Sequence, residues 1–96
     1  MAIQRIVKMT FQLERSDEFQ TFFNEIKEQI TAQPGCFSVK LLRDKIDSGI
    51  FFTFSVWDKQ SSLDAYRETE LFGMVWPKVK NWFTAKPEAW STEIAG

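Results

Sequence analysis

The chain has 96 residues, a formal net charge of −1 and an unusual aromatic content, with 10 Phe and 4 Trp. This length suits one domain, residues 1–96, built around a single core. Lys and Arg are scattered, which argues against the basic face that nucleic-acid binding requires. No apolar run is long enough to cross a membrane, and no secretory signal pattern opens the chain.

Histidine is absent, and there is a single cysteine, Cys36. These two counts exclude histidine acid–base chemistry, Ser-His-Asp triads, His-based metal or haem ligation within the chain, and an internal disulfide. A lone thiol without a neighbouring base favours a buried, unreactive cysteine and a reducing cytoplasm as the location. The sequence contains no metal-ligand spacing, glycine-rich phosphate loop or paired carboxylates, so no metal or cofactor is expected.

A strand over residues 3–12 is expected to open the fold, because Ile3, Val7, Met9 and Phe11 alternate with polar residues such as Lys8. An amphipathic helix follows, for which Asp17 is the predicted N-cap and Gln20 the partner in a capping box. Pro34-Gly35 ends this helix and turns the chain. The apolar residues of the helix recur at the offsets of one face: Phe19, Phe22, Phe23, Ile26 and Ile30.

Residues 36–44 form the second predicted strand, and the turn Asp47-Ser48-Gly49 joins it to a third strand over residues 50–57. This third strand is apolar on both faces, since alternate side chains point to opposite sides of a sheet. Phe51 and Trp57 lie on one face, and the other consists of Ile50, Phe52, Phe54 and Val56. So short a chain has enough helix to cover one face only, which predicts a homodimer joined through sheet faces.

Two further helices and a last strand complete the pattern. Asp58 is expected to N-cap a helix to about residue 68, and Thr69 a second helix to about residue 83. Pro77 falls inside the second helix, and Gly73, four residues earlier, gives the backbone room to bend there. That bend either opens a cleft or lets the helix follow a curved sheet. With a strand over 88–94, the order β-α-β-β-α-(α)-β predicts an α+β, ferredoxin-like fold with helices on one face of an antiparallel sheet.

Several short motifs together resemble the antibiotic biosynthesis monooxygenase (ABM) domain family. These are Pro34-Gly35-Cys36, Leu42-Arg43-Asp44, and the strand ending Phe54-Ser55-Val56-Trp57 before the helix Leu63-Asp64-Ala65-Tyr66-Arg67. The resemblance runs from about residue 3 to residue 90 and implies a dimeric α+β barrel, in which two ferredoxin-like units pack sheet to sheet. The family includes cofactor-independent oxygenases that act on polycyclic aromatic phenols, haem-degrading monooxygenases and many members of unknown activity.

The haem-degrading branch is not expected for this chain. Trp76 aligns with the histidine ligand of that branch, and Tyr66 with its tryptophan. Its first-strand asparagine aligns with Ile6, Val7 or Lys8. The resemblance therefore favours a cofactor-independent monooxygenase acting on a small or polycyclic aromatic or phenolic substrate. The alternative is a non-catalytic dimeric domain that binds a small apolar ligand.

Cofactor-free oxygenation needs an apolar pocket that excludes water and a polar group that stabilises the substrate anion. Tyr66 is the candidate hydrogen-bond donor, and Lys8 the candidate cation if it points toward the helices. The predicted walls of the substrate pocket are Phe22, Ile26, Phe72, Val75 and Trp76. Each has a structural alternative: the aromatic residues as core, Lys8 as a solvated or paired surface charge, and Arg67 as part of a wet helix face.

Overall fold

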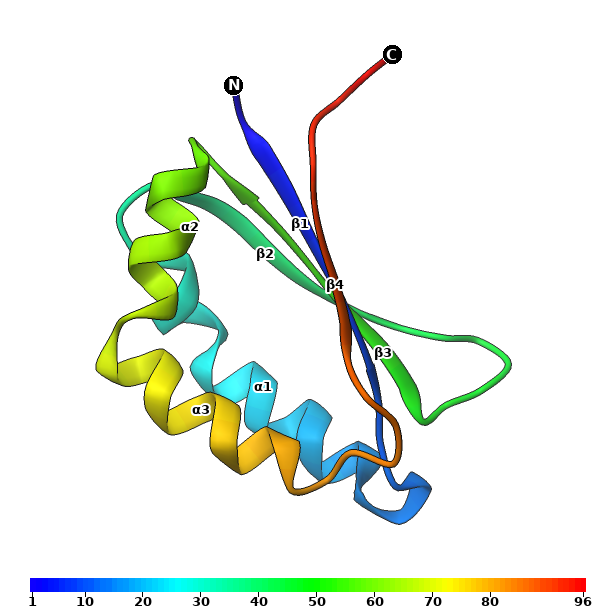
Figure 1. The fold of residues 1–96 in the computed structure, drawn as a ribbon. Coiled ribbons are helices and arrows are strands. Elements are labelled where there is room, and N and C mark those ends of the chain that lie inside the picture. The colour runs from blue at the N-terminus through cyan, green and yellow to red at the C-terminus, as the bar shows by residue number, and fades with distance from the viewer.

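The computed structural model describes all 96 residues and has two layers, a sheet and a set of helices (Figure 1). The sheet is four-stranded and antiparallel, with strand order β2-β3-β1-β4. All three α-helices pack on one face, and both termini lie at the same end of the sheet (Figure 1). The α+β, ferredoxin-like fold is confirmed. The elements are β1 Ile3–Thr10, a short 3-10 helix η1 Leu13–Arg15, α1 Ser16–Thr31, β2 Cys36–Arg43, β3 Ile50–Trp57, α2 Gln60–Arg67, α3 Glu70–Lys80 and β4 Glu88–Thr92.

The register of the strands sorts every side chain onto one of the two faces. Val7 pairs with Thr53 of β3 and Ala89 of β4, so these rows face the helices. Ile6 pairs with Phe54 and Trp90 on the opposite face, which no helix covers. The two-faced character predicted for β3 is therefore confirmed. We call the uncovered side the open sheet face. Its apolar residues are Ile6, Leu42, Ile50, Phe52, Phe54, Val56 and Trp90.

The core lies between the sheet and the helices and is mostly aromatic at one end. Phe51 of β3 is fully buried, and Phe11 and Phe19 pack on it edge to face, with ring centroids 5.6 and 5.1 Å away. The rings of Phe11 and Phe19 stack on each other at 4.2 Å. Offset and edge-to-face pairs of this kind add stability beyond the area that they bury.

The starts of two helices differ from the prediction. Helix α1 begins at Ser16 after η1, and neither Asp17 nor Gln20 caps it; their side chains bind Arg43 of β2 instead. Helix α2 begins at Gln60 with no side-chain cap, so Asp58 is not its N-cap. The Thr69 cap of α3 is confirmed, since its hydroxyl accepts a hydrogen bond from the Phe72 amide at 3.2 Å.

Arg43 joins the β2–β3 hairpin to the first turn of α1. Its guanidinium donates hydrogen bonds to Asp17 Oδ1 and Gln20 Oε1, both at 2.9 Å, and to Ser16 Oγ at 2.8 Å. The Arg43 Nε–H group also donates to the Ser48 carbonyl at 2.8 Å, and the guanidinium lies 4.8 Å from the centre of the Phe51 ring. The side chain is only 28% exposed, so these charge-assisted bonds form partly away from water.

Replacing Arg43 by Met is expected to lower the free energy of unfolding by about 2–3 kcal/mol, because four charge-assisted hydrogen bonds are lost together. Urea denaturation would measure the change. Lys45→Met, at an exposed position in the adjacent turn, removes the same charge without removing a contact and is the control. Equal stabilities of the two variants would show that the Arg43 network contributes nothing.

Candidate functional site

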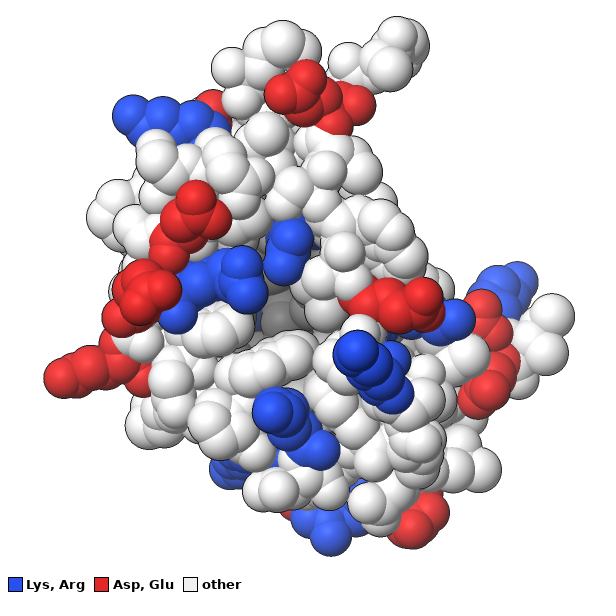
Figure 2. Space-filling view, in the orientation of Figure 1, with Lys and Arg blue, Asp and Glu red and all other residues white.

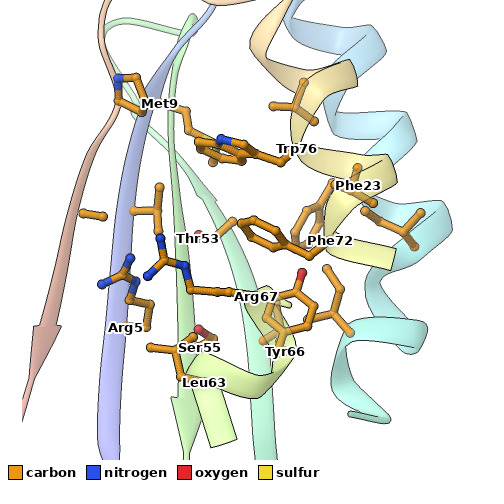
Figure 3. Close-up of a pocket in the computed structure, with 18 of the residues that line it drawn as sticks. Arg5, Met9, Phe23, Thr53, Ser55, Leu63, Tyr66, Arg67, Phe72 and Trp76 are labelled. Carbon is orange, nitrogen blue, oxygen red and sulfur yellow. The ribbon is translucent and has the colours of Figure 1, made fainter. Parts of the chain in front are cut away.

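A cavity of about 380 Å³ lies between the sheet and the helices (Figure 3). Of its 20 lining residues, 15 are hydrophobic, so the cavity suits an apolar body rather than a sugar or a nucleotide. In Figure 2 it is visible as a hollow in the centre of the face shown, with basic side chains beside it. The polar residues of the lining are Arg5, Thr53, Ser55, Tyr66 and Arg67.

Aromatic rings from three elements form one wall of the cavity. Tyr66 of α2 stacks on Trp57 of β3, with ring centroids 5.2 Å apart, and meets Phe72 of α3 edge to face at 5.4 Å. Phe72 stacks in turn on Trp76 at 5.9 Å. The three- and four-residue spacing of α2 and α3 brings these rings to the sheet side of each helix. A flat aromatic ligand would find ring faces and ring edges along this wall.

Tyr66 is the hydrogen-bonding group of this wall. Its ring is held between Trp57 and Phe72, and its hydroxyl makes no hydrogen bond within the protein. Burial, with a smaller contribution from the nearby Cys36, raises the pKa of Tyr66 to about 12. The phenol is therefore protonated at neutral pH, which makes Tyr66 a hydrogen-bond donor and not a base.

Two arginines lie on the opposite side of the cavity from the Tyr66 hydroxyl. Arg5 projects from β1, and Arg67 reaches across from the end of α2 toward it (Figure 3). Arg5 donates one hydrogen bond, to Ser91 Oγ at 3.1 Å, and Arg67 makes no hydrogen bond or ion pair. Burial is the main cause that lowers the pKa of Arg5, and the charge of Arg67 lowers it further.

Most of the predicted site residues meet at this cavity. Ile26, Phe72, Val75 and Trp76 line it together with Tyr66. Phe22 does not, because it lies on the flank of α1, where its ring faces Trp82 at 6.2 Å and the Lys78 ammonium at 4.4 Å.

Lys8 does not reach the cavity either. It pairs in register with Phe52 and Glu88, so its side chain lies on the open sheet face, and its ammonium is 3.9 Å from a Glu88 carboxylate oxygen. The condition attached to Lys8, that it should point toward the helices, is not met.

The site residues predicted from the sequence did not include the two arginines of the cavity. Arg5 alternates with Ile3, Val7 and Met9 and is therefore the one charged residue in the helix-facing row of β1. A charge in an otherwise apolar row is a signal that the sequence contained. Arg67 was interpreted as part of a wet helix face, and only the placement of α2 against the sheet shows that it lines the cavity.

The sequence profile of one family, described as antibiotic biosynthesis monooxygenase (ABM), matches residues 2–75. The chain belongs to the ABM family. No curated protein sequence matches it. The predicted family is thus confirmed over most of the chain, including β1, the β2–β3 hairpin and the helix that carries Tyr66 and Arg67.

Several solved structures share the whole fold. A structure described as an antibiotic biosynthesis monooxygenase is 20% identical, with a TM-score of 0.90 over 98% of this chain and 99% of that one. A conserved protein from Methanosarcina mazei Go1 is 18% identical, with a TM-score of 0.91 over 97% and 92%. Rv0793 from Mycobacterium tuberculosis is 14% identical, with a TM-score of 0.89 over 100% and 97%. At these identities the likeness establishes the fold alone.

Neither a spanning helix nor a metal-binding cluster is found. None of the helices combines the length and the apolar character needed to cross a bilayer. No three His, Cys, Asp or Glu residues come together in a group that could hold a metal ion.

Proposed function

We propose that the protein is a monooxygenase of the ABM type that oxidises a small or polycyclic aromatic phenol with dioxygen and no bound cofactor. The observation that carries this proposal is the cavity, which combines an aromatic wall, a Tyr66 hydroxyl free to donate, and two cations. The apolar lining limits the contact of water with a reactive carbanion or phenolate, and the cations stabilise the negative charge.

The chemistry requires an electron-rich substrate, because the chain offers no redox group to dioxygen. The substrate anion supplies the electrons, one oxygen atom forms a bond to the substrate carbon, and the other leaves as water. An anthrone, for example, would consume one dioxygen and give one quinone and one water. In this scheme the guanidinium groups of Arg5 and Arg67 lower the energy of the anion, and the wall of Trp57, Phe72 and Trp76 holds the rings.

Oxygen uptake with a hydroxylated anthrone, measured in the presence of a metal chelator, tests the proposal. Uptake with formation of the quinone, above the rate of spontaneous oxidation, is the expected result. Thr53→Phe is the matched control, since it places a ring in the cavity from the central strand β3 and should return the rate to the background. Equal rates with and without the protein, across a panel of phenols and quinols, would reject the oxygenase.

The second candidate is a non-catalytic dimeric domain that binds a small apolar ligand. The observation that favours it is the lack of a side-chain base in the cavity, whose lining contains no His, Asp, Glu or Lys. Ligand binding without oxygen uptake would support this candidate. In either case we propose that the functional unit is a homodimer joined through the open sheet face.

Replacing Tyr66 by Phe is expected to weaken the binding of a phenol by roughly 0.5–1.5 kcal/mol, because one hydrogen bond to the ligand is lost. The melting temperature should hardly change, since the hydroxyl has no partner within the protein and the ring contacts with Trp57 and Phe72 remain. Calorimetric titration and a thermal melt measure the two quantities. Unchanged affinity would show that Tyr66 is only a wall residue.

A further inference from the structure

The charge of the cavity lining is entirely positive. Arg5 and Arg67 are its charged residues, and no carboxylate is among the 20 residues of the lining. A guanidinium has five N–H donors. One bond from Arg5 to Ser91 and none from Arg67 leave most of these donors without a protein partner. The donors therefore remain for a ligand or for water.

The two guanidinium groups also disfavour each other. Arg67 reaches toward Arg5 across the cavity (Figure 3), and its charge contributes to the lowered pKa of Arg5. Asp64 acts in the opposite direction on Arg5, but it lies outside the cavity lining. Two like charges that face each other repel, and an anion placed between them offsets that repulsion.

No lining group is suited to take a proton from a substrate. The lining has no His, Asp, Glu or Lys, and the raised pKa of Tyr66 keeps its phenol protonated. A neutral phenol that entered the cavity would find cations that stabilise its anion but no base to form it. A ligand that already carries its negative charge needs no such base.

We infer that the cavity selects aromatic compounds that are already anionic in solution, such as acidic phenols, enols and aromatic acids, and that Arg5 and Arg67 together hold the charged group. This inference rests on the proposed function, since it names the substrate class of the same cavity. The aromatic body would lie along Tyr66, Phe72 and Trp76, with the anion directed at the side formed by β1 and the end of α2.

Two fluorescent probes that differ mainly in charge test this inference. The anion 8-anilinonaphthalene-1-sulfonate and the neutral N-phenyl-1-naphthylamine share their ring systems, and both brighten in apolar surroundings. The wild-type protein is expected to bind the sulfonate at least tenfold more tightly than the neutral amine. Arg5→Gln and Arg67→Gln should each weaken sulfonate binding about tenfold, as expected for one lost charge-assisted hydrogen bond. Neither variant should change the affinity for the neutral probe more than about twofold.

Two control variants make the result specific. Lys80→Gln removes a positive charge from α3 outside the cavity lining and should leave both affinities as in the wild type. Thr53→Phe should abolish binding of both probes if they occupy the cavity, whereas a probe on the open sheet face would be unaffected. Thermal melts identify any variant that has lost its fold, and Arg67→Lys, which keeps the charge, should retain part of the sulfonate affinity.

Equal affinities of the two probes for the wild type would overturn the inference, as would sulfonate binding that is unchanged in both Gln variants. Neither outcome concerns oxygen uptake, so the proposed monooxygenase activity would stand. Conversely, a clear preference for the anion without any oxygen uptake would reject the oxygenase and keep the anion-selective cavity.

Discussion

Replacing Phe52 by Glu is expected to convert a dimer into monomers that unfold far more easily. Phe52 lies on the open sheet face beside Leu42 of β2 and between rows that contain Ile50 and Phe54. This face is apolar at its centre, and Leu42 and Trp90 on its two sides remain 48% and 45% exposed in one chain. An exposed apolar surface of this kind marks an interface, and in an obligate dimer it resembles a core cut in two.

The effect should be large because the new carboxylate would lose its hydration when two sheets pack together, and its cross-strand neighbour Lys8 already lies 3.9 Å from the Glu88 carboxylate. Removing a charge from water costs several kcal/mol even beside an opposite charge, so we expect the dissociation constant of the dimer to rise by more than about 100-fold. Sedimentation velocity at micromolar concentration should give twice the 11.3 kDa chain mass for the wild type and the chain mass for Phe52→Glu.

Gln29→Glu provides a control of equal charge. Gln29 is exposed on α1, away from the open sheet face, and this variant should remain a dimer of wild-type stability. A wild-type protein that sediments as a stable monomer, or a Phe52→Glu protein that remains a dimer, would remove the basis for the homodimer.

The strands were the part of the fold most accessible from the sequence. The limits of β3, Ile50–Trp57, match the prediction at both ends, because a run of aromatic and β-branched residues between a Ser-Gly turn and the polar Asp58-Lys59 leaves little choice. The Thr69 cap was equally predictable, since a Thr directly before an apolar helix is a preferred N-cap residue.

The predicted capping box of α1 is wrong because a residue from another part of the chain binds its side chains. Asp17 and Gln20 have the spacing of a capping box, but Arg43 comes from a distant strand and takes both side chains. The bond from the guanidinium to Gln20 is charge-assisted, and the bond to Asp17 joins two full opposite charges, so the local preference for backbone amides is overridden. Sequence spacing alone contains no information about a partner more than 20 residues away.

The sequence predicted most of the apolar residues that line the cavity, but it did not predict the charged ones. Helical periodicity placed Ile26, Phe72, Val75 and Trp76 on the buried sides of α1 and α3, and the structure brings these residues together. Strand alternation also places Lys8 on the opposite face of β1 from Val7 and Met9, and this placement excludes Lys8 from the cavity. The position of Arg67 could not be predicted, because the sequence does not determine which face of α2 packs against the sheet. That face depends on the paths of the loops that connect α2 to β3 and α3.

Gly35→Ala is expected to produce the other large effect, a loss of about 2 kcal/mol or more in the free energy of unfolding. Gly35 has a φ of +83°, a left-handed conformation that costs an L-residue with a Cβ roughly 1–2 kcal/mol. The added Cβ would also lie 2.5 Å from Asp58 Oδ1 and from the Ser62 Cβ, and against the Ser62 hydroxyl. These atoms cannot all move away, because the Asp58 amide donates a hydrogen bond to the Gly35 carbonyl at 2.8 Å.

Gly73→Ala is the matched control, and it is expected to stabilise the protein rather than destabilise it. Gly73 lies inside α3, its Cβ would meet no atom within 4 Å, and the helix runs through Pro77 from Glu70 to Lys80. An Ala there should raise the free energy of unfolding by roughly 0.5–1 kcal/mol, because glycine is the more flexible residue in the unfolded chain. Urea denaturation of the two variants would measure both changes. A destabilised Gly73→Ala would mean that α3 needs glycine to accommodate Pro77, and a neutral Gly35→Ala would mean that the start of β2 is free to move away from α2.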